Sequence, residues 1–375
     1  MKILHLITSL SHGGAQKTLL QLSFFDTDND HVIISLLPSF SFSHWTIPNH
    51  VQIHLLDIKS NPIHTISQIL KFIRLDQPDV IQSWLYHADF LTILLKPFVS
   101  PPIFWNIRHT NFSFTTDKFS TIFLLPILSF FSWLVPHKII SCSYAGIFVH
   151  QKLLYSPKKF TYLPNAVDTS LFYPSVSFSF SERVSSLSQS GLVLGFAGRY
   201  HPQKDFSTLF RTLNILKTVY QLDFHIILAG SGLTHHNQSL YKLIRNYSLS
   251  ENVSLLGPLN YDDIRSFMSF IDIFVLSSSH GEGFPNVLLE SLACATPCVT
   301  TKSGDSHLVI SDSCCAVDVS SPYQLALAIL DMSRHLLSLS NTEYSEFSFD
   351  LINHVNSAYS LSSMCSSYRS SWRLL

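Results

Sequence analysis

The sequence predicts an α/β protein built from two doubly wound domains. Strand-like apolar runs alternate with segments of helical period almost from end to end, which is typical of parallel sheets with crossover helices. This alternation stops at residues 165–190, a serine-rich stretch without clear periodicity, and then starts again. The chain has 375 residues, 46% of them hydrophobic, which is enough for two domains that each bury a core of their own.

Twelve strands are expected, and each is a short apolar run. Seven precede the interruption, at 2–7, 31–37, 51–56, 79–84, 102–107, 138–143 and 159–164. Five follow it, at 192–198, 224–230, 252–257, 271–277 and 296–301. Segments between the strands, such as 205–220, carry apolar residues at helical spacing.

These elements define the expected domains. The first is 1–165, the second is 166–345, and 346–375 is a helical tail that could pack back on the first domain. Ligands of such sheets bind at the carboxyl ends of the strands, here in a cleft where the two domains face each other.

The amino-terminal segment MKILHLITSL is interpreted as a first strand rather than a signal peptide. Its apolar run is short and interrupted by polar residues, and SHGGAQ follows without a small-residue cleavage site. This predicts a cytoplasmic protein whose six cysteines are reduced. Because no Cys-x-x-Cys occurs, buried thiols are favoured over a zinc site.

Charge is sparse and unevenly distributed. Residues 1–165 contain 12 Lys or Arg and 8 Asp or Glu, a net +4, and the remainder contains 12 and 17, a net −5. A basic first half suggests contact with anionic lipid, phosphate or nucleic acid, although chance distribution of a few charges gives the same pattern.

Residues 119–136 form a stretch of eighteen residues without a formal charge, FSTIFLLPILSFFSWLVP. That length is at the threshold for a membrane span. However, Pro126 lies in its middle, four hydroxyl residues interrupt it, and a crossover helix is required at this point of the fold. A helix resting on a membrane surface and a buried helix are the other two interpretations.

Two carboxylates lie in the apolar segment HGEGFPNVLLE, residues 280–290. Pro285 suits the first turn of a helix whose unpaired N–H groups would favour a phosphate. Glu282 precedes this helix and Glu290 lies two turns along it. Carboxylates accept paired hydrogen bonds from the neighbouring hydroxyls of a sugar or ribose. The alternative is one charge that complements the helix dipole and one that is solvated, which the apolar neighbours of Glu290 make unfavourable.

A positive counterpart follows the first strand of the second domain, in GFAGRYHPQKD. Arg199 and Lys204 offer a guanidinium fork and a lysine charge to a diphosphate. A basic residue after a strand is usually only solvated. Together with Glu282 and Glu290, however, the set describes a sugar nucleotide held by cations at its phosphates and by carboxylates at its hydroxyls.

The spacing of Glu282 and Glu290 within EGFPNVLLESLA resembles the E-x7-E signature of the family 4 retaining glycosyltransferases, group 1 glycosyl transferases with the GT-B fold. Further segments resemble that family in its own order: SLSHGGAQKTLLQL its glycine loop and helix, LPNAVDTSLFYP the entry to the second domain, GRYHPQKD the phosphate-binding turn, LLG a later strand end, and TKSGDSHLVI the loop after the E-x7-E helix. The resemblance extends from residue 3 to about residue 335. It departs at Ala166, where the family usually has glycine, and it is looser in the first domain.

The resemblance implies a site. The residues implied to bind the donor are Gly13, Gly14, Arg199, Lys204, Gly283, Phe284, Asn286 and Glu290. Among them the two cations would bind the diphosphate, Glu290 would bind the ribose, and the paired glycines would let the first loop approach the phosphate closely. The residues implied in catalysis are Glu282, which would contact the donor sugar, and His109 and His87, which follow first-domain strands in WNIRHTNF and WLYHADF. A lone histidine is more often a structural hydrogen bonder, so this alternative stays open for both.

The function implied is transfer of a sugar from a nucleoside-diphosphate sugar to an acceptor hydroxyl, with retention of anomeric configuration. In the front-face mechanism implied for it, the leaving phosphate helps to deprotonate the acceptor, so no metal and no cofactor besides the donor are expected. No Asp-x-Asp motif is present. An apolar, basic first domain suits a lipid-linked or polysaccharide acceptor in bacterial surface glycan synthesis (lipopolysaccharide, O-antigen or capsule).

Such an acceptor implies peripheral contact with the inner face of the cytoplasmic membrane, and no nucleic acid partner is expected. The alternatives are a nucleotide-sugar epimerase of the same fold and a non-catalytic scaffold of a polysaccharide assembly complex. A nicotinamide dehydrogenase is disfavoured because SHGGAQ lacks G-x-G-x-x-G.

Overall fold

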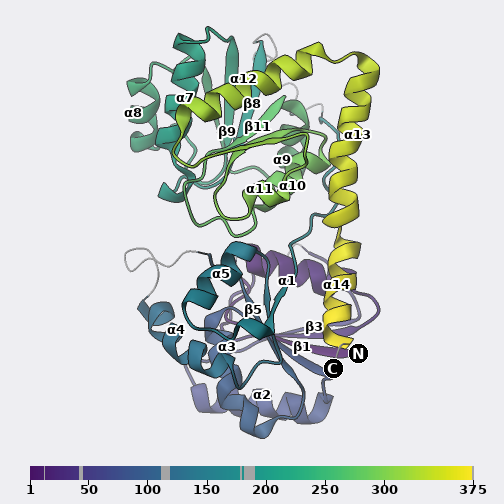
Figure 1. Ribbon diagram of the computed structural model, residues 1–375. Coiled ribbons are helices and arrows are strands. Elements are labelled where there is room, and N and C mark those ends of the chain that lie inside the picture. Colours follow the sequence, from purple (N-terminus) through teal and green to yellow (C-terminus); the bar gives the residue numbers. More distant parts are fainter. Residues whose placement is uncertain (12, 42–44, 111–118, 178–179, 181–190, 374–375) are drawn as a thin grey trace. The chain divides into compact units, whose positions relative to one another are not determined.

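The computed structural model describes residues 1–11, 13–41, 45–110, 119–177, 180 and 191–373, and the chain divides into two compact units (Figure 1). The first unit comprises Met1–Asn165 together with Leu361–Leu375, and the second comprises Ala166–Ser360. Residues 346–360, expected in the tail, are part of the second unit. Part of the serine-rich stretch, 178–179 and 181–190, lies outside the described residues.

The first unit is built on a seven-stranded sheet of order β3-β2-β1-β4-β5-β6-β7, in which all neighbours pair in parallel. Its strands are β1 (Lys2–Ile7), β2 (Asp30–Ser35), β3 (Val51–Leu55), β4 (Val80–Trp84), β5 (Ile103–Ile107), β6 (Lys138–Ser141) and β7 (Phe160–Tyr162). Its helices are α1 (Gly14–Phe25), α2 (Pro62–Asp76), α3 (Tyr86–Leu95), α4 (Phe119–Ser132), α5 (Tyr144–Lys152) and α14 (Leu361–Arg373), with 3₁₀ turns η1 (Lys96–Phe98) and η2 (Pro157–Lys159).

The second unit contains a six-stranded parallel sheet of order β10-β9-β8-β11-β12-β13. Its strands are β8 (Leu192–Ala197), β9 (Phe224–Ala229), β10 (Val253–Gly257), β11 (Ile273–Leu276), β12 (Cys298–Thr301) and β13 (Cys315–Val317). Its helices are α7 (Phe206–Thr218), α8 (Gln238–Asn246), α9 (Tyr261–Phe270), α10 (Asn286–Ala293), α11 (Ser306–Val309), α12 (Pro322–Ser338) and α13 (Asn341–Ala358), with the 3₁₀ turn η3 (Pro202–Lys204).

The predicted α/β class with two doubly wound sheets is confirmed, and each of the twelve expected strands is present. The strands read as apolar runs because helices cover both faces of a parallel sheet and bury both sets of side chains. The sequence missed β13, which has three half-buried residues and therefore no apolar run to mark it.

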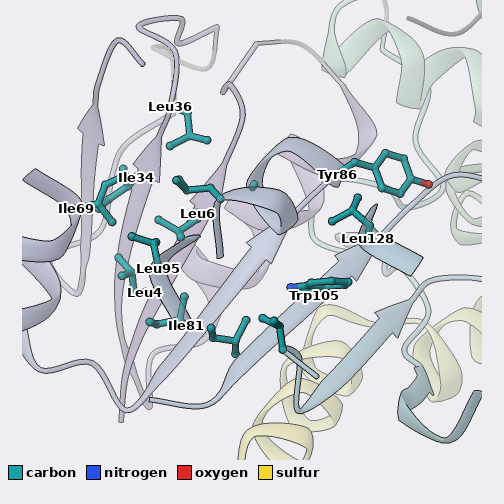
Figure 2. Packing of buried hydrophobic residues seen from close by; sticks show 14 of the residues in the cluster. Leu4, Leu6, Ile34, Leu36, Ile69, Ile81, Tyr86, Leu95, Trp105 and Leu128 are labelled. Carbon is teal, nitrogen blue, oxygen red and sulfur yellow. The ribbon is translucent and has the colours of Figure 1, made fainter. Parts of the chain in front are cut away.

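One face of the first sheet forms a hydrophobic core with α2, α3 and α4. Side chains that alternate along the strands meet there, including Leu4 and Leu6 of β1, Ile34 of β2 and Trp105 of β5 (Figure 2). The opposite face buries polar side chains at the intervening positions, including His5, His31, Gln82 and Asn106. A buried polar side chain requires a hydrogen-bonding partner.

Helix α14 supplies some of these hydrogen-bonding partners. Trp372 Nε1 donates to Gln82 Oε1 at 2.8 Å, and Asn106 Nδ2 donates to the Tyr368 hydroxyl at 2.9 Å. The guanidinium of Arg369 forms an ion pair with Asp26, at the end of α1, with Nε 2.7 Å from Oδ1. Residues more than 230 positions apart in the chain thus complete the first unit (Figure 1).

The apolar stretch 119–136 forms α4 and the turn after it, with Pro126 inside the helix. In the part of the chain that the structure describes, no helix combines the length and the apolarity needed to cross a membrane. The six cysteines are free thiols, four of them buried. Among the described residues, no three His, Cys, Asp or Glu side chains are grouped so as to hold a metal ion.

Candidate functional site

The order of strands in the second sheet reverses between β8 and β11. Sheets of this kind bind ligands at such a reversal, outside the carboxyl ends of the strands. The turn after β8 carries Lys204, and the loop after β11 carries Glu282. Ser279 N donates to the Gln203 carbonyl at 2.9 Å, and Ser277 Oγ donates to the Lys204 carbonyl at 2.7 Å, so the two loops are joined directly.

Lys204 and Glu282 form an ion pair at this position. Lys204 Nζ lies 2.5 Å from Glu282 Oε1, and the two side chains are only 13% and 9% exposed. Ser278 Oγ donates to the same carboxylate oxygen at 2.6 Å. Two residues that the sequence assigned to the diphosphate and to the donor sugar are therefore one hydrogen-bonded group, in which the lysine neutralises a buried carboxylate.

The loop after β12 packs against the backbone of Glu282. A Cβ atom on Gly304 would lie 1.5 Å from the Glu282 carbonyl oxygen, and Gly304 has a φ of +56°. Both observations require glycine at this position. Ser278 and Gly304 were not among the predicted site residues. The available signals were the run of serines directly after β11 and the glycine within TKSGDSHLVI.

Helix α10 begins at Asn286 and has Pro285 as its N-cap, without a side-chain cap. The helix thus starts one residue later than the sequence indicated. Phe284 is buried, with its ring 5.6 Å from that of Tyr359, so its side chain packs inside the unit while its backbone leads into the first turn. Gly283 precedes it on the same loop and is half-buried.

Arg199 and Glu290 belong to the same edge of the second sheet. Arg199 follows β8 by two residues and is exposed. Glu290 lies in the second turn of α10, is half-buried, and adds to the effect of burial in raising the pKa of the Cys294 thiol to about 12. These two residues thus occupy elements adjacent to the Lys204–Glu282 pair.

In the first sheet the order of strands reverses between β1 and β4. Gly13 is the N-cap of α1, in the segment after β1. A Cβ on Gly13 would meet only the flexible end of Gln16, and one on Gly14 would meet nothing within 4 Å. The backbone and packing of the protein therefore do not require glycine at either position.

The two predicted histidines lie near the same edge of the first sheet. His87 falls in the first turn of α3 rather than at the end of β4, and its Nε2 lies 3.2 Å from Ser120 Oγ on α4. His109 follows β5 and is half-buried, with its ring centroid 6.0 Å from that of Tyr86.

Arg108, which precedes His109, is held in place on several sides. Its Nε donates to Asn106 Oδ1 at 2.7 Å, and a terminal nitrogen donates to the Tyr368 hydroxyl of α14 at 2.9 Å. Its guanidinium lies 5.1 Å from the centroid of the Trp84 ring. The backbone that carries His109 is therefore fixed by β4, β5 and the last helix.

Comparisons with known proteins agree with this geometry. Residues 191–335 match the family model described as glycosyl transferases group 1. The lipopolysaccharide core biosynthesis glycosyltransferase LpsE of Rhizobium meliloti is 40% identical over 106 residues, which are 28% of this chain and 28% of that protein. The N-acetylgalactosamine-N,N'-diacetylbacillosaminyl-diphospho-undecaprenol 4-alpha-N-acetylgalactosaminyltransferase of Campylobacter jejuni is 31% identical over 168 residues, 43% of this chain and 41% of that protein. The chain thus spans less than half the length of either relative.

A solved structure extends the likeness to the whole chain. The crystal structure of Anabaena Alr3699/HepE in complex with UDP covers 100% of both chains with a TM-score of 0.82 at 16% sequence identity. At this identity the likeness concerns the fold.

These findings identify the fold of the chain and the family of one domain. The fold is that of the GT-B glycosyltransferases, with two Rossmann-like domains. Residues 191–335, which hold the Lys204–Glu282 pair, form a glycosyl transferases group 1 domain.

Proposed function

We propose that this protein transfers a sugar from a nucleoside-diphosphate sugar to an acceptor hydroxyl, with retention of configuration and without a metal ion. The observation that supports this most directly is the Lys204–Glu282 pair at the strand reversal of a group 1 glycosyltransferase domain. A cation that is already positioned beside the leaving group stabilises the charge that develops on a diphosphate during transfer. The bound UDP in the HepE structure makes UDP-sugars the first donors to test.

In this mechanism the two cations have different environments. Lys204 is half-buried and oriented by Glu282, so it would bind the diphosphate from a fixed position. Arg199 is exposed, and its guanidinium would move onto the phosphates and donate two parallel hydrogen bonds. The N–H groups at the start of α10 have no side-chain cap and would add a partial positive charge.

The carboxylates and the first-unit residues take the remaining roles. Glu282 would accept a hydrogen bond from a hydroxyl of the donor sugar, with the backbone of Gly283 and Phe284 beside that sugar. Glu290, together with Asn286, would bind the ribose. On the first unit, His109 and His87 are the candidates for sugar contact, and the Gly13–Gly14 segment is the candidate for close approach to a phosphate.

The acceptor that we propose is a lipid-linked or polysaccharide glycan of the bacterial surface, and the protein would work at the inner face of the cytoplasmic membrane through peripheral contact of its first unit. Two relatives support this proposal, since one is named for lipopolysaccharide core biosynthesis and the other for a diphospho-undecaprenol acceptor. The proposed chemistry requires no cofactor besides the donor, and no nucleic acid.

The test is a donor screen on the purified full-length protein. UDP-, GDP- and ADP-sugars are incubated with it, and released nucleoside diphosphate and free sugar are measured with and without EDTA. We expect turnover of one donor class, unchanged by EDTA, and NMR spectra taken before mutarotation should show the released sugar in the anomeric configuration of the donor. Arg199→Ala should reduce turnover strongly, while Lys302→Ala, an exposed lysine after β12, serves as the matched control and should not. A protein that binds and turns over no nucleotide sugar would contradict the proposal.

A further inference from the structure

Helix α4 has large apolar side chains on its exposed face. Phe119, Phe123 and Phe130 are 81%, 64% and 65% exposed, and with Pro126 they recur at the spacing of one helical face. The opposite face buries Leu125, Leu128, Ser129 and Ser132, which include two hydroxyl residues. A surface helix of a globular protein normally has polar side chains on its outer face, whereas α4 has large apolar side chains there in addition to the leucines that it buries.

The exposed apolar surface continues beyond the end of the helix. Trp133, Leu134 and Leu154 are each more than half exposed. Trp133 Nε1 donates to the Leu154 carbonyl at 3.1 Å, so these two lie together. Large apolar side chains gathered on one surface mark an interaction site rather than ordinary solvent exposure.

A cavity of about 470 Å³ lies beside this surface, and Leu134 is part of its wall. Lys96, His137 and Lys159 also line it, and no aspartate or glutamate is among its described lining residues. Lys159 Nζ donates to the Trp133 carbonyl at 2.7 Å, which holds this lysine against the apolar surface. The cavity therefore presents basic groups at the border of an exposed apolar surface.

The cavity is separate from the predicted site on this unit. It is lined by residues at the amino ends of β5 and β6, whereas His109 follows the carboxyl end of β5. Burial lowers the pKa of Lys159, and burial together with the charges of Lys138 and Lys159 lowers the pKa of His137. The shift of His137 thus reflects two neighbouring cations, an arrangement that a bound anion would stabilise.

We propose that this surface docks on an anionic phospholipid bilayer, with a headgroup phosphate in the cavity and the exposed aromatic side chains in the headgroup–acyl boundary. Lysines near a membrane surface attract anionic lipids, and exposed Trp, Phe and Leu side chains enter the interface. A soluble phosphate compound would engage the basic groups but would leave the aromatic side chains in water. The inference makes specific the membrane contact proposed above and does not depend on the sugar-transfer reaction.

The experiment measures binding of the full-length protein to vesicles, without any sugar donor. Sedimentation is compared between vesicles of phosphatidylcholine alone and vesicles that also contain phosphatidylglycerol. We expect clear preference for the anionic vesicles, and about a five-fold loss of affinity in each of Lys96→Gln and Lys159→Gln, since one lysine near an anionic surface contributes about that factor. Phe123→Ser/Phe130→Ser should lose binding to both kinds of vesicle.

Matched controls come from the second unit. Lys302→Gln and Phe349→Ser change an exposed lysine and an exposed phenylalanine there and should leave binding unchanged. Of the five tryptophans, Trp84, Trp105 and Trp372 are fully buried, Trp45 is half-buried beside Phe24, and Trp133 is exposed on the proposed surface. A blue shift of tryptophan emission on vesicles should therefore vanish in Trp133→Phe while sedimentation persists. Circular dichroism confirms that each variant is folded.

Three outcomes would overturn the inference. Equal binding to neutral vesicles, or unchanged affinity in both lysine variants, would show apolar adsorption without a headgroup site. Absence of binding to either kind of vesicle, together with binding of glycerol phosphate that is lost in Lys96→Gln and Lys159→Gln, would show that the cavity selects a free phosphate compound. Failure of the donor screen with normal vesicle binding would affect the proposed reaction alone.

Discussion

Lys204 and Glu282 form a structural ion pair to which we also assign a role in the proposed reaction. The pair is largely buried, and Ser278 adds a hydrogen bond to the carboxylate. Removing one member of a buried ion pair leaves an uncompensated charge, whereas replacing both with neutral groups is far less costly. A loss of activity on changing Lys204 alone would therefore combine a catalytic effect with a folding effect.

We predict that Lys204→Met lowers the free energy of unfolding of the second unit by about 3 kcal/mol, and that Lys204→Met/Glu282→Gln recovers most of it without recovering activity. The measurement is urea unfolding followed by circular dichroism. All five tryptophans lie in the first unit, so the fluorescence transition is an internal control that should not move. Equal stability of Lys204→Met and the unchanged protein would contradict the pairing.

His150 is a buried histidine of the first unit whose pKa burial lowers to about 4. Its Nε2 lies 2.9 Å from the Tyr86 hydroxyl, and its Nδ1 lies 2.7 Å from the Gly146 carbonyl. In the unfolded chain an imidazole titrates near 6.5. Between these two values the unfolded state binds the additional proton, so the stability of the first unit rises with pH across that window.

We therefore predict that the first unit is most stable above pH 6.5 and loses about 3 kcal/mol from this group as pH falls to 4. Tryptophan fluorescence in urea at a series of pH values measures this loss. The same series on His150→Gln should show a smaller slope, because the buried group no longer titrates. An unchanged slope in that variant would assign the effect to other groups, such as His5, whose pKa burial and the charge of His31 also lower.

At the scale of elements, α14 joins the first unit through polar contacts as well as through buried apolar side chains. The Tyr368 hydroxyl accepts hydrogen bonds from Asn106 and Arg108, and Trp372 Nε1 donates one to the amide oxygen of Gln82. The side chain of Tyr368 is fully buried. Losing its hydroxyl would leave two donors without this partner, a change that costs more than the net strength of a hydrogen bond.

Tyr368→Phe should lower the unfolding free energy of the first unit by about 1–3 kcal/mol, measured by tryptophan fluorescence in urea. Tyr323→Phe changes an exposed tyrosine of α12 and is the matched control. If His109 contacts substrate, Tyr368→Phe should also lower turnover at temperatures where the variant is fully folded, because Arg108 loses one of its anchors. A stable variant with a normal unfolding midpoint would show that the contact is dispensable.

At the scale of the whole molecule, the chain is two units with separate cores, and the two-state description is not expected to hold for such a protein. We predict that fluorescence, which reports the first unit, and circular dichroism, which reports both, give different unfolding curves. UDP lacks the sugar that His109 and His87 would contact, so it should stabilise mainly the second unit, by about 2.7 kcal/mol at a hundred times its dissociation constant. A shift of the fluorescence transition by UDP that exceeds the shift of the circular dichroism transition would contradict the assignment of most donor contacts to the second unit.

The strands could be predicted from the sequence because a parallel sheet is buried on both faces, so that each strand is a nearly continuous run of apolar residues. The site was predicted only as a set of residue types at the ends of strands. The contacts within the site could not be predicted from the local sequence pattern. Lys204 and Glu282 are 78 positions apart, and glycine is required at 304 because the carbonyl of Glu282, on another loop, lies where a Cβ atom would be. The roles of Arg199, Glu290, His109 and His87 stay predictions.

The sequence by itself determined the α/β class, the two sheets and the residues around the strand reversal of the second one, because periodicity and local spacing are properties of neighbouring positions. Tertiary structure alone decided which charges pair, that the last helix completes the first unit, and that the apolar stretch 119–136 presents phenylalanines outward beside a basic cavity. Pairing, docking and exposure depend on distances between residues far apart in the chain, and only the folded chain sets those distances.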